Sequence, residues 1–236
     1  MNIILFEEKP SLIPLKDERA RHIMKVLRMH EGDAFKAGII NGPGLSCVIE
    51  RIDDEGIHVS CTEGEDMSSL YPLTLVLAEV RPICMKRILR ETVSLGVGKI
   101  MLVISDTGEK SYSEASLYTS GEYREILVDG AMQAGFTGVP EVVFCSSVQD
   151  AIRKLGSESK VLLDNVIGSV PLSSMDLTDA GPVALAIGPE RGWSERERNL
   201  FLLNGFKPAL IGHRILRTET AAVAGCAMTL SQMGLI

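Results

Sequence analysis

The chain has few cysteines and no long apolar run, and each of these features excludes some classes of protein. It has five cysteines in 236 residues, the closest two are 14 residues apart, and no C-x-x-C pair occurs. So few and so widely spaced cysteines are not typical of a disulfide framework or a zinc knuckle, so we expect reduced, mostly buried thiols. No apolar run approaches the roughly 18 residues that cross a bilayer, and the start turns acidic at Glu7 and Glu8 instead of resembling a signal peptide. These absences predict a cytoplasmic protein without membrane association.

An excess of positive charge is also missing. The chain has 24 Lys and Arg against 31 Asp and Glu, a net charge of −7, which argues against indiscriminate adhesion to nucleic acid. Residues 19–28 nevertheless contain four permanent cations and no acid. Ile23, Val26 and Leu27 recur there at helical spacing, which predicts a short helix with one apolar face and a basic outer surface, capped by Asp17.

Two domains are predicted, with a boundary near residue 70. Residues 1–70 contain short β-rich runs (34–40, 45–52 and 56–61), which fit a small curled sheet or barrel. Residues 71–236 alternate strands with helices, which predicts a mostly parallel α/β sheet. Ser194 and Glu197 form a capping-box pattern, and residues 168–181 are predicted to be a connecting loop. The expected strands are 73–80, 99–104, 141–144, 160–164, 183–187 and 207–211, and the expected helices are 83–95, 117–134, 148–155, one from Ser194 and one from Thr218.

Familiar nucleotide and metal motifs fail on spacing. The run from Gly96 to Ile100 lacks the earlier glycine and the final Ser or Thr of a Walker loop, and Met101 stands where a dinucleotide fingerprint needs its last glycine. The four histidines do not form zinc spacing. We therefore expect no NAD or nucleoside triphosphate site and no metal.

Two glycine-bearing loops follow apolar strands near the C-terminus. One runs from Gly188 to Ser194 and the other from Gly212 to Arg217, and each leads into a predicted helix. Ligands of open α/β sheets bind at such strand ends and helix N-termini. For the first loop alone, an ordinary turn and a ligand site are about equally good readings, since glycine and proline are common in turns.

The residues of these loops resemble a known family. Ile187-Gly188-Pro189-Glu190 with Gly192, followed by Leu216-Arg217-Thr218-Glu219-Thr220-Ala221, is similar to the signature loops of the bacterial 16S rRNA uridine-N3 methyltransferases, the RsmE branch of the SPOUT methyltransferases. The basic run 21–28 and the helix end 91–98 also resemble that family, and the match covers essentially the whole chain. Arg191, Met132 and Phe136 depart from its usual pattern.

The resemblance implies a PUA-like RNA-binding β-barrel over 1–70 and a SPOUT methyltransferase domain over 71–236, whose C-terminal segment threads a trefoil knot. It further implies S-adenosylmethionine bound in the knot, 16S rRNA within the small ribosomal subunit as substrate, a homodimer, and no metal.

The predicted site residues fall into three groups. Arg217 and Glu219 are the catalytic candidates: Glu219 could accept the N3 proton and Arg217 could stabilise the developing anion, while a structural Arg217–Glu219 pair at the helix start stays at least equally open. The expected RNA contacts are Arg19, Arg21, Lys25, Arg28 and Arg191. The expected cofactor contacts are Leu163, Ile187, Gly188, Glu190, Gly192, Leu210, Ile211, Gly212, Ile215 and Leu216.

Two alternatives stay open. One is a non-catalytic RNA-binding factor of ribosome assembly that retains the fold, and the other is a SPOUT methyltransferase acting on a different RNA position, including the ribose 2′-oxygen. Small residues of the last helix, Ala221, Ala222, Ala224, Gly225 and Ala227, are expected to form part of the dimer interface.

Overall fold

The computed structural model describes residues 2–236, and these form two compact units. The first unit takes the chain up to Ser69 together with Val128–Val139, and the second takes Leu70–Leu127 together with Pro140–Ile236. The chain therefore passes out of the first unit, returns to it once, and leaves it again. None of the helices within residues 2–236 combines the length and the apolar character needed to cross a membrane.

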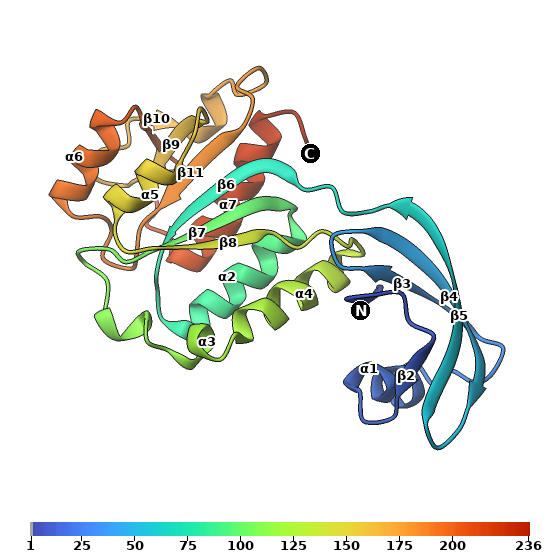
Figure 1. Ribbon diagram of the computed structural model, residues 1–236. Coiled ribbons are helices and arrows are strands. Elements are labelled where there is room, and N and C mark those ends of the chain that lie inside the picture. Colours follow the sequence, from blue (N-terminus) through green and yellow to red (C-terminus); the bar gives the residue numbers. More distant parts are fainter. Residues whose placement is uncertain (1) are drawn as a thin grey trace. The chain divides into compact units, whose positions relative to one another are not determined.

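The first unit is built on a five-stranded curled sheet in the order β1-β3-β4-β5-β2 (Figure 1). The β1 strand runs parallel to β3 and the other neighbours are antiparallel. The three β-rich runs of the sequence are confirmed as β3, β4 and β5, while the three-residue strands β1 and β2 were not predicted. The bounds are β1 Ile4–Phe6, β2 Leu12–Pro14, β3 Ala34–Ile39, β4 Pro43–Ile52 and β5 Gly56–Asp66.

The expectation of reduced cysteines is wrong for one pair. Cys47 on β4 lies directly opposite Cys61 on β5, with 4.1 Å between their Cα atoms, and the two form a disulfide. The pairing arises from the hairpin register, which a count of cysteines does not reveal. Cys84, Cys145 and Cys226 are free, as expected.

The basic segment is helical but not as one regular α-helix. It begins as α1 (Glu18–Arg21), capped by the Asp17 carboxylate that accepts from the Arg19 amide at 2.9 Å, and continues as a π-helical turn over His22–Val26. The wider turn rotates the later residues away from the core, so the predicted apolar face is wrong beyond Ile23. Ile23 is buried, whereas Val26 is 65% exposed and Leu27 is 39% exposed.

The second unit contains a seven-stranded sheet in which every neighbouring pair is parallel, in the order β10-β12-β9-β11-β6-β7-β8. This confirms the predicted α/β architecture. The strands are β6 Tyr71–Ala78, β7 Val97–Val103, β8 Glu141–Cys145, β9 Ser159–Leu163, β10 Val170–Pro171, β11 Val183–Ile187 and β12 Lys207–Leu210. The short β10 and a 3₁₀ turn at Leu172–Ser174 lie within the segment predicted to be only a loop.

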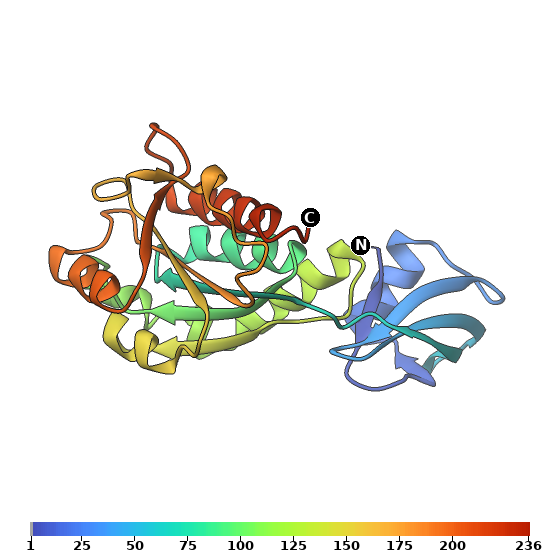
Figure 2. The same cartoon turned by 90° about the horizontal axis from the view of Figure 1, so that it is seen from above.

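Helices cover both faces of this sheet (Figures 1 and 2). On one face α7 packs against β6, β11 and α2, and on the other α5 packs against β7, β8 and α6. The predicted helix over 117–134 is divided at Gly121, whose φ of +83° ends α3 before α4 begins. The bounds are α2 Pro82–Ser94, α3 Ser116–Thr119, α4 Glu122–Ala134, α5 Val148–Lys154, α6 Glu195–Leu203 and α7 Thr218–Gln232.

The segment that returns to the first unit is fixed there by Thr137. This residue is fully buried, its hydroxyl donates to the Gly42 carbonyl at 2.6 Å, and its carbonyl accepts from the Asn41 amide at 2.9 Å. A Cβ on Gly38 would lie 2.4 Å from the Thr137 methyl group. The first unit therefore closes over a side chain that comes from far along the sequence.

Candidate functional site

The candidate site lies at the carboxyl ends of three adjacent strands. The strands β12, β9 and β11 are neighbours in the sheet and run in one direction. The loops that follow β9, β11 and β12 therefore leave the same edge, and the last two are the glycine-bearing loops of the sequence. This is the edge at which open parallel sheets bind ligands.

These loops surround a cavity of about 730 Å³, which lies within the size range of small-molecule sites. The wall combines apolar side chains with backbone of the three loops. It includes all ten residues predicted to contact the cofactor: Leu163, Ile187, Gly188, Glu190, Gly192, Leu210, Ile211, Gly212, Ile215 and Leu216. The catalytic candidates Arg217 and Glu219, and Arg191 from the RNA group, also line it.

Two glycines of the wall have different surroundings. A Cβ at Gly188 would lie 3.2 Å from the indole of Trp193, which is buried and forms part of the wall. A Cβ at Gly212 would meet nothing within 4 Å, so this position faces open space. The apolar side chain of Ile215 is 83% exposed at the same loop. Gly212 and Ile215 thus present a surface that no other part of residues 2–236 covers.

Two carboxyl groups, those of Glu190 and Glu219, lie near the first turn of α2. The Glu190 side chain accepts from the backbone amide of Arg81 at 3.2 Å, at the residue before the first turn of α2. The pKa of the Cys84 thiol is raised, first by burial and then by the negative charges of Glu219 and Glu190. Both carboxylates therefore lie close to one thiol at the cavity wall.

The Arg217 side chain forms neither a capping hydrogen bond nor an ion pair within residues 2–236. It occupies the N-cap position of α7 without a side-chain capping bond, and it is exposed. The anticipated structural pair with Glu219 is not formed, since within residues 2–236 no ion pair joins them. A guanidinium that lines a cavity and has no protein partner is free to bind a ligand.

The structure adds wall residues that the sequence did not assign to the cofactor, among them Arg81, Thr107 and Tyr112. They come from the segments that follow β6 and β7. A hydrogen bond to Tyr112 is the main reason that the pKa of Arg81 is raised. Neither segment belongs to the two glycine-bearing loops near the C-terminus, so the order of strands in the sheet was needed to place them at this edge.

The remaining predicted RNA contacts lie on the basic segment of the first unit. Arg19 is occupied there: its guanidinium pairs with Asp17 at 2.6 Å, donates to the Leu5 carbonyl at 3.1 Å and stacks over Phe6 at 4.5 Å. The other three cations, Arg21, Lys25 and Arg28, are exposed and form no ion pair within residues 2–236.

Comparison with known proteins identifies the family. The model of the RNA methyltransferase domain matches residues 67–230, and the model of the RNA methyltransferase PUA domain matches residues 15–60. The chain belongs to the RNA methyltransferase family. The cavity wall falls inside the first match and the exposed cations inside the second.

Relatives of this RNA methyltransferase carry a more specific name. Ribosomal RNA small subunit methyltransferase E of Treponema pallidum is 38% identical over 98% of this chain and 91% of its own length. Ribosomal RNA small subunit methyltransferase E 1 of Borreliella burgdorferi is 29% identical over 99% of both chains. A solved structure of the enzyme from Neisseria gonorrhoeae, bound to S-adenosyl methionine, superimposes with a TM-score of 0.78 and 25% identity over 98% of this chain and 97% of that chain.

Proposed function

We propose that this RNA methyltransferase transfers a methyl group from S-adenosylmethionine to N3 of a uridine in 16S rRNA. The observation that carries the proposal is the convergence of all ten expected cofactor residues on one cavity at the carboxyl edge of the sheet. Relatives named as small-subunit rRNA methyltransferases, one of them solved with S-adenosyl methionine, support this substrate and this methyl donor.

The cavity suits the cofactor. Its volume of about 730 Å³ is sufficient, and Leu163, Ile187 and Leu210 provide an apolar wall for a flat heterocycle. Gly212 lets a ligand approach the backbone because no side chain occupies that space. The cofactor supplies an electrophilic methyl group, and the loops exclude water and hold the acceptor base in line with it.

The protein must also remove the proton from uridine N3. Glu219 is half-buried at the first turn of α7 and serves as the base, and Arg217 donates to a uracil carbonyl oxygen as negative charge spreads from N3. Arg217 is available for this because none of residues 2–236 forms an ion pair with its side chain.

The first unit contributes affinity for RNA. Arg21, Lys25 and Arg28 contact phosphates, together with Arg191 at the cavity. Arg19 is better described as a structural residue that fixes α1 to Asp17 and Phe6. The proposal also includes a homodimer, a trefoil knot in the C-terminal segment, action on the small ribosomal subunit, and a cytoplasmic location.

The central test pairs calorimetry with analysis of rRNA nucleosides. The purified protein is expected to bind S-adenosylmethionine, and 16S rRNA from a strain lacking the gene is expected to lose 3-methyluridine by mass spectrometry. Absence of binding at millimolar cofactor, with RNA binding intact, would favour the non-catalytic assembly factor. Loss of a 2′-O-methylated nucleoside instead would assign the chain to another RNA position.

Arg217→Lys tests the proposed catalytic arrangement. The lysine keeps the charge but cannot offer two donors in a fixed fork. Methylation is expected to slow by roughly a hundredfold while cofactor affinity stays unchanged, because the donor acts on charge that develops in the transition state. A normal rate in single-turnover measurements would assign Arg217 a structural role at the start of α7.

A further inference from the structure

A buried ion pair joins the loop after β9 to helix α6, which follows the loop after β11. Asp164 follows β9 directly, its side chain is 2% exposed, and its Oδ2 accepts from Arg198 Nε at 2.8 Å. Arg198 belongs to α6, and its side chain is 15% exposed. Removing two charges from water costs free energy that an apolar pair would not, so packing alone does not account for this pair.

Asp164 shapes the loop after β9. Its Oδ1 accepts from the amides of Val166 at 2.7 Å and Ile167 at 3.1 Å, and its carbonyl accepts from the Gly168 amide at 2.9 Å. A Cβ on Gly168 would lie 2.4 Å from that carbonyl. Asp164 and Asn165 both line the cavity. Because both carboxylate oxygens are already bonded within the chain, Asp164 acts by fixing this loop.

Arg198 lies beneath the loop after β11. A Cβ on Gly192, whose φ is +69°, would come within 3.3 Å of the Arg198 Nη2 atom. Its helix begins at a complete capping box, in which Ser194 Oγ accepts from the Glu197 amide at 3.1 Å and Glu197 accepts from the Ser194 amide at 2.8 Å. The guanidinium therefore extends from a fixed helical turn to Asp164 on the neighbouring loop.

We infer that the Asp164–Arg198 pair sets the affinity of the cavity for S-adenosylmethionine, by holding the loop after β9 against the loop after β11. Both are positioning residues: they keep backbone groups of the wall in place for a ligand that neither needs to contact. Loops that are ordered before binding lose less conformational entropy when the ligand arrives. The inference rests on the proposed function for the identity of the ligand.

Three variants separate positioning from stability: Asp164→Asn, Arg198→Met, and the two combined. Each single change leaves an unpaired polar or charged group buried, so the melting temperature is expected to fall and the dissociation constant for S-adenosylmethionine to rise roughly tenfold or more. The double variant removes both charges, so its melting temperature should recover most of the loss. Its dissociation constant should stay high, because the loops are no longer joined.

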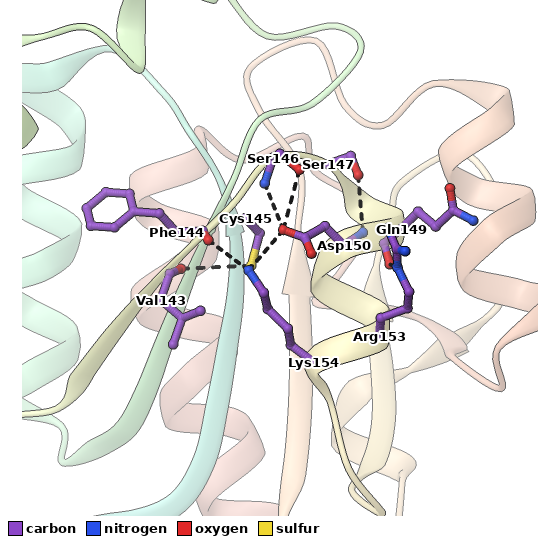
Figure 3. Close-up of polar contacts among 9 residues, drawn as sticks. All are labelled: Val143, Phe144, Cys145, Ser146, Ser147, Gln149, Asp150, Arg153 and Lys154. Atoms are coloured by element: carbon purple, nitrogen blue, oxygen red, sulfur yellow. Dashed lines mark hydrogen bonds and ion pairs between the residues drawn. The ribbon is translucent and has the colours of Figure 1, made fainter.

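Cofactor binding can be followed by calorimetry and by the fluorescence of Trp193, which is the only tryptophan in the chain and lines the cavity. Lys154→Met is the matched control. Lys154 binds Asp150 Oδ2 at 2.9 Å and the Phe144 carbonyl at 3.0 Å, outside the cavity wall (Figure 3). Loss of this half-exposed pair is expected to change the dissociation constant by no more than about twofold.

Recovery of wild-type affinity together with stability in the double variant would overturn the inference, and so would wild-type affinity in both single variants. If the single variants do not fold, the double variant alone decides the question. A wild-type protein that binds no S-adenosylmethionine would instead overturn the proposed function. The KM for the cofactor is expected to rise in the double variant while the KM for RNA stays unchanged, a split that general destabilisation would not produce.

Discussion

At the scale of single residues, Glu79 is a buried carboxyl group at the end of β6. It is 7% exposed, and burial raises its pKa from 4.5 to about 7. The Tyr118 hydroxyl is also buried without a hydrogen-bond partner within residues 2–236, and its pKa is raised by burial and then by the charge of Glu79. Ionisation of Glu79 therefore places an uncompensated negative charge in the interior.

This arrangement predicts that stability falls as the pH rises from about 4.5 to about 7. In that interval the folded chain retains a proton that the unfolded chain has lost, so each step upward in pH favours unfolding until the folded carboxyl ionises as well. The contribution is roughly 3 kcal/mol. Urea unfolding at pH 5 and pH 8 should show this loss in the wild type.

Glu79→Gln should remove that loss and be more stable than the wild type at pH 8. Glu141→Gln is the matched control, since Glu141 is exposed and pairs with Lys99 at the surface. A pH dependence that is the same in Glu79→Gln and in the wild type would show that other groups cause it.

At the scale of elements, the basic segment presents Arg21, Lys25 and Arg28 to solvent while only Ile23 is buried. Changing the three cations to Gln should weaken binding to 16S rRNA and lower the slope of log affinity against log salt by about 2 to 3. Cofactor affinity should not change. Filter binding at several salt concentrations measures the slope, and equal loss of RNA and cofactor binding would indicate unfolding instead.

Sequence patterns predicted most elements of the second unit closely, because most of its apolar strands alternate with helices and because start signals such as Ser194 are clear. They failed where the controlling interaction is not local. The π-helical turn at His22–Val26 moves Val26 and Leu27 out of the expected face, and the Cys47–Cys61 bond depends on hairpin register. The glycine-bearing loops indicated a large part of the cavity wall. Tyr112 and Asp164 were not predicted. Their loops reach the cavity because of the order of the strands in the sheet, which the sequence does not show.

At the scale of the whole molecule, α7 limits how a second copy could bind. Ala222 and Gly225 are buried, and a Cβ on Gly225 would lie 2.6 Å from Leu163, so this part of the small-residue surface packs within the chain. Ala221, Ala224 and Ala227 remain partly exposed and available. We expect a homodimer, with twice the chain mass of 25.6 kDa, in light scattering at micromolar concentration.

Ala224→Glu should shift that dimer toward monomer, because it places a charge at the expected contact without entering the core. A change at exposed Leu203 on α6 serves as the control. A monomeric mass for the unaltered protein would contradict the expected dimer.

The return of Val128–Val139 to the first unit has a consequence for synthesis on the ribosome. When Ser69 has been made, the first sheet still lacks the Thr137 side chain that fills the space beside Gly38. At the usual rate of about 5–20 residues per second, that side chain is made several seconds later. The N-terminal unit is thus a nascent intermediate that reaches its final packing only after part of the second unit has been translated. A chaperone that binds nascent chains would therefore encounter this unit before its packing is complete.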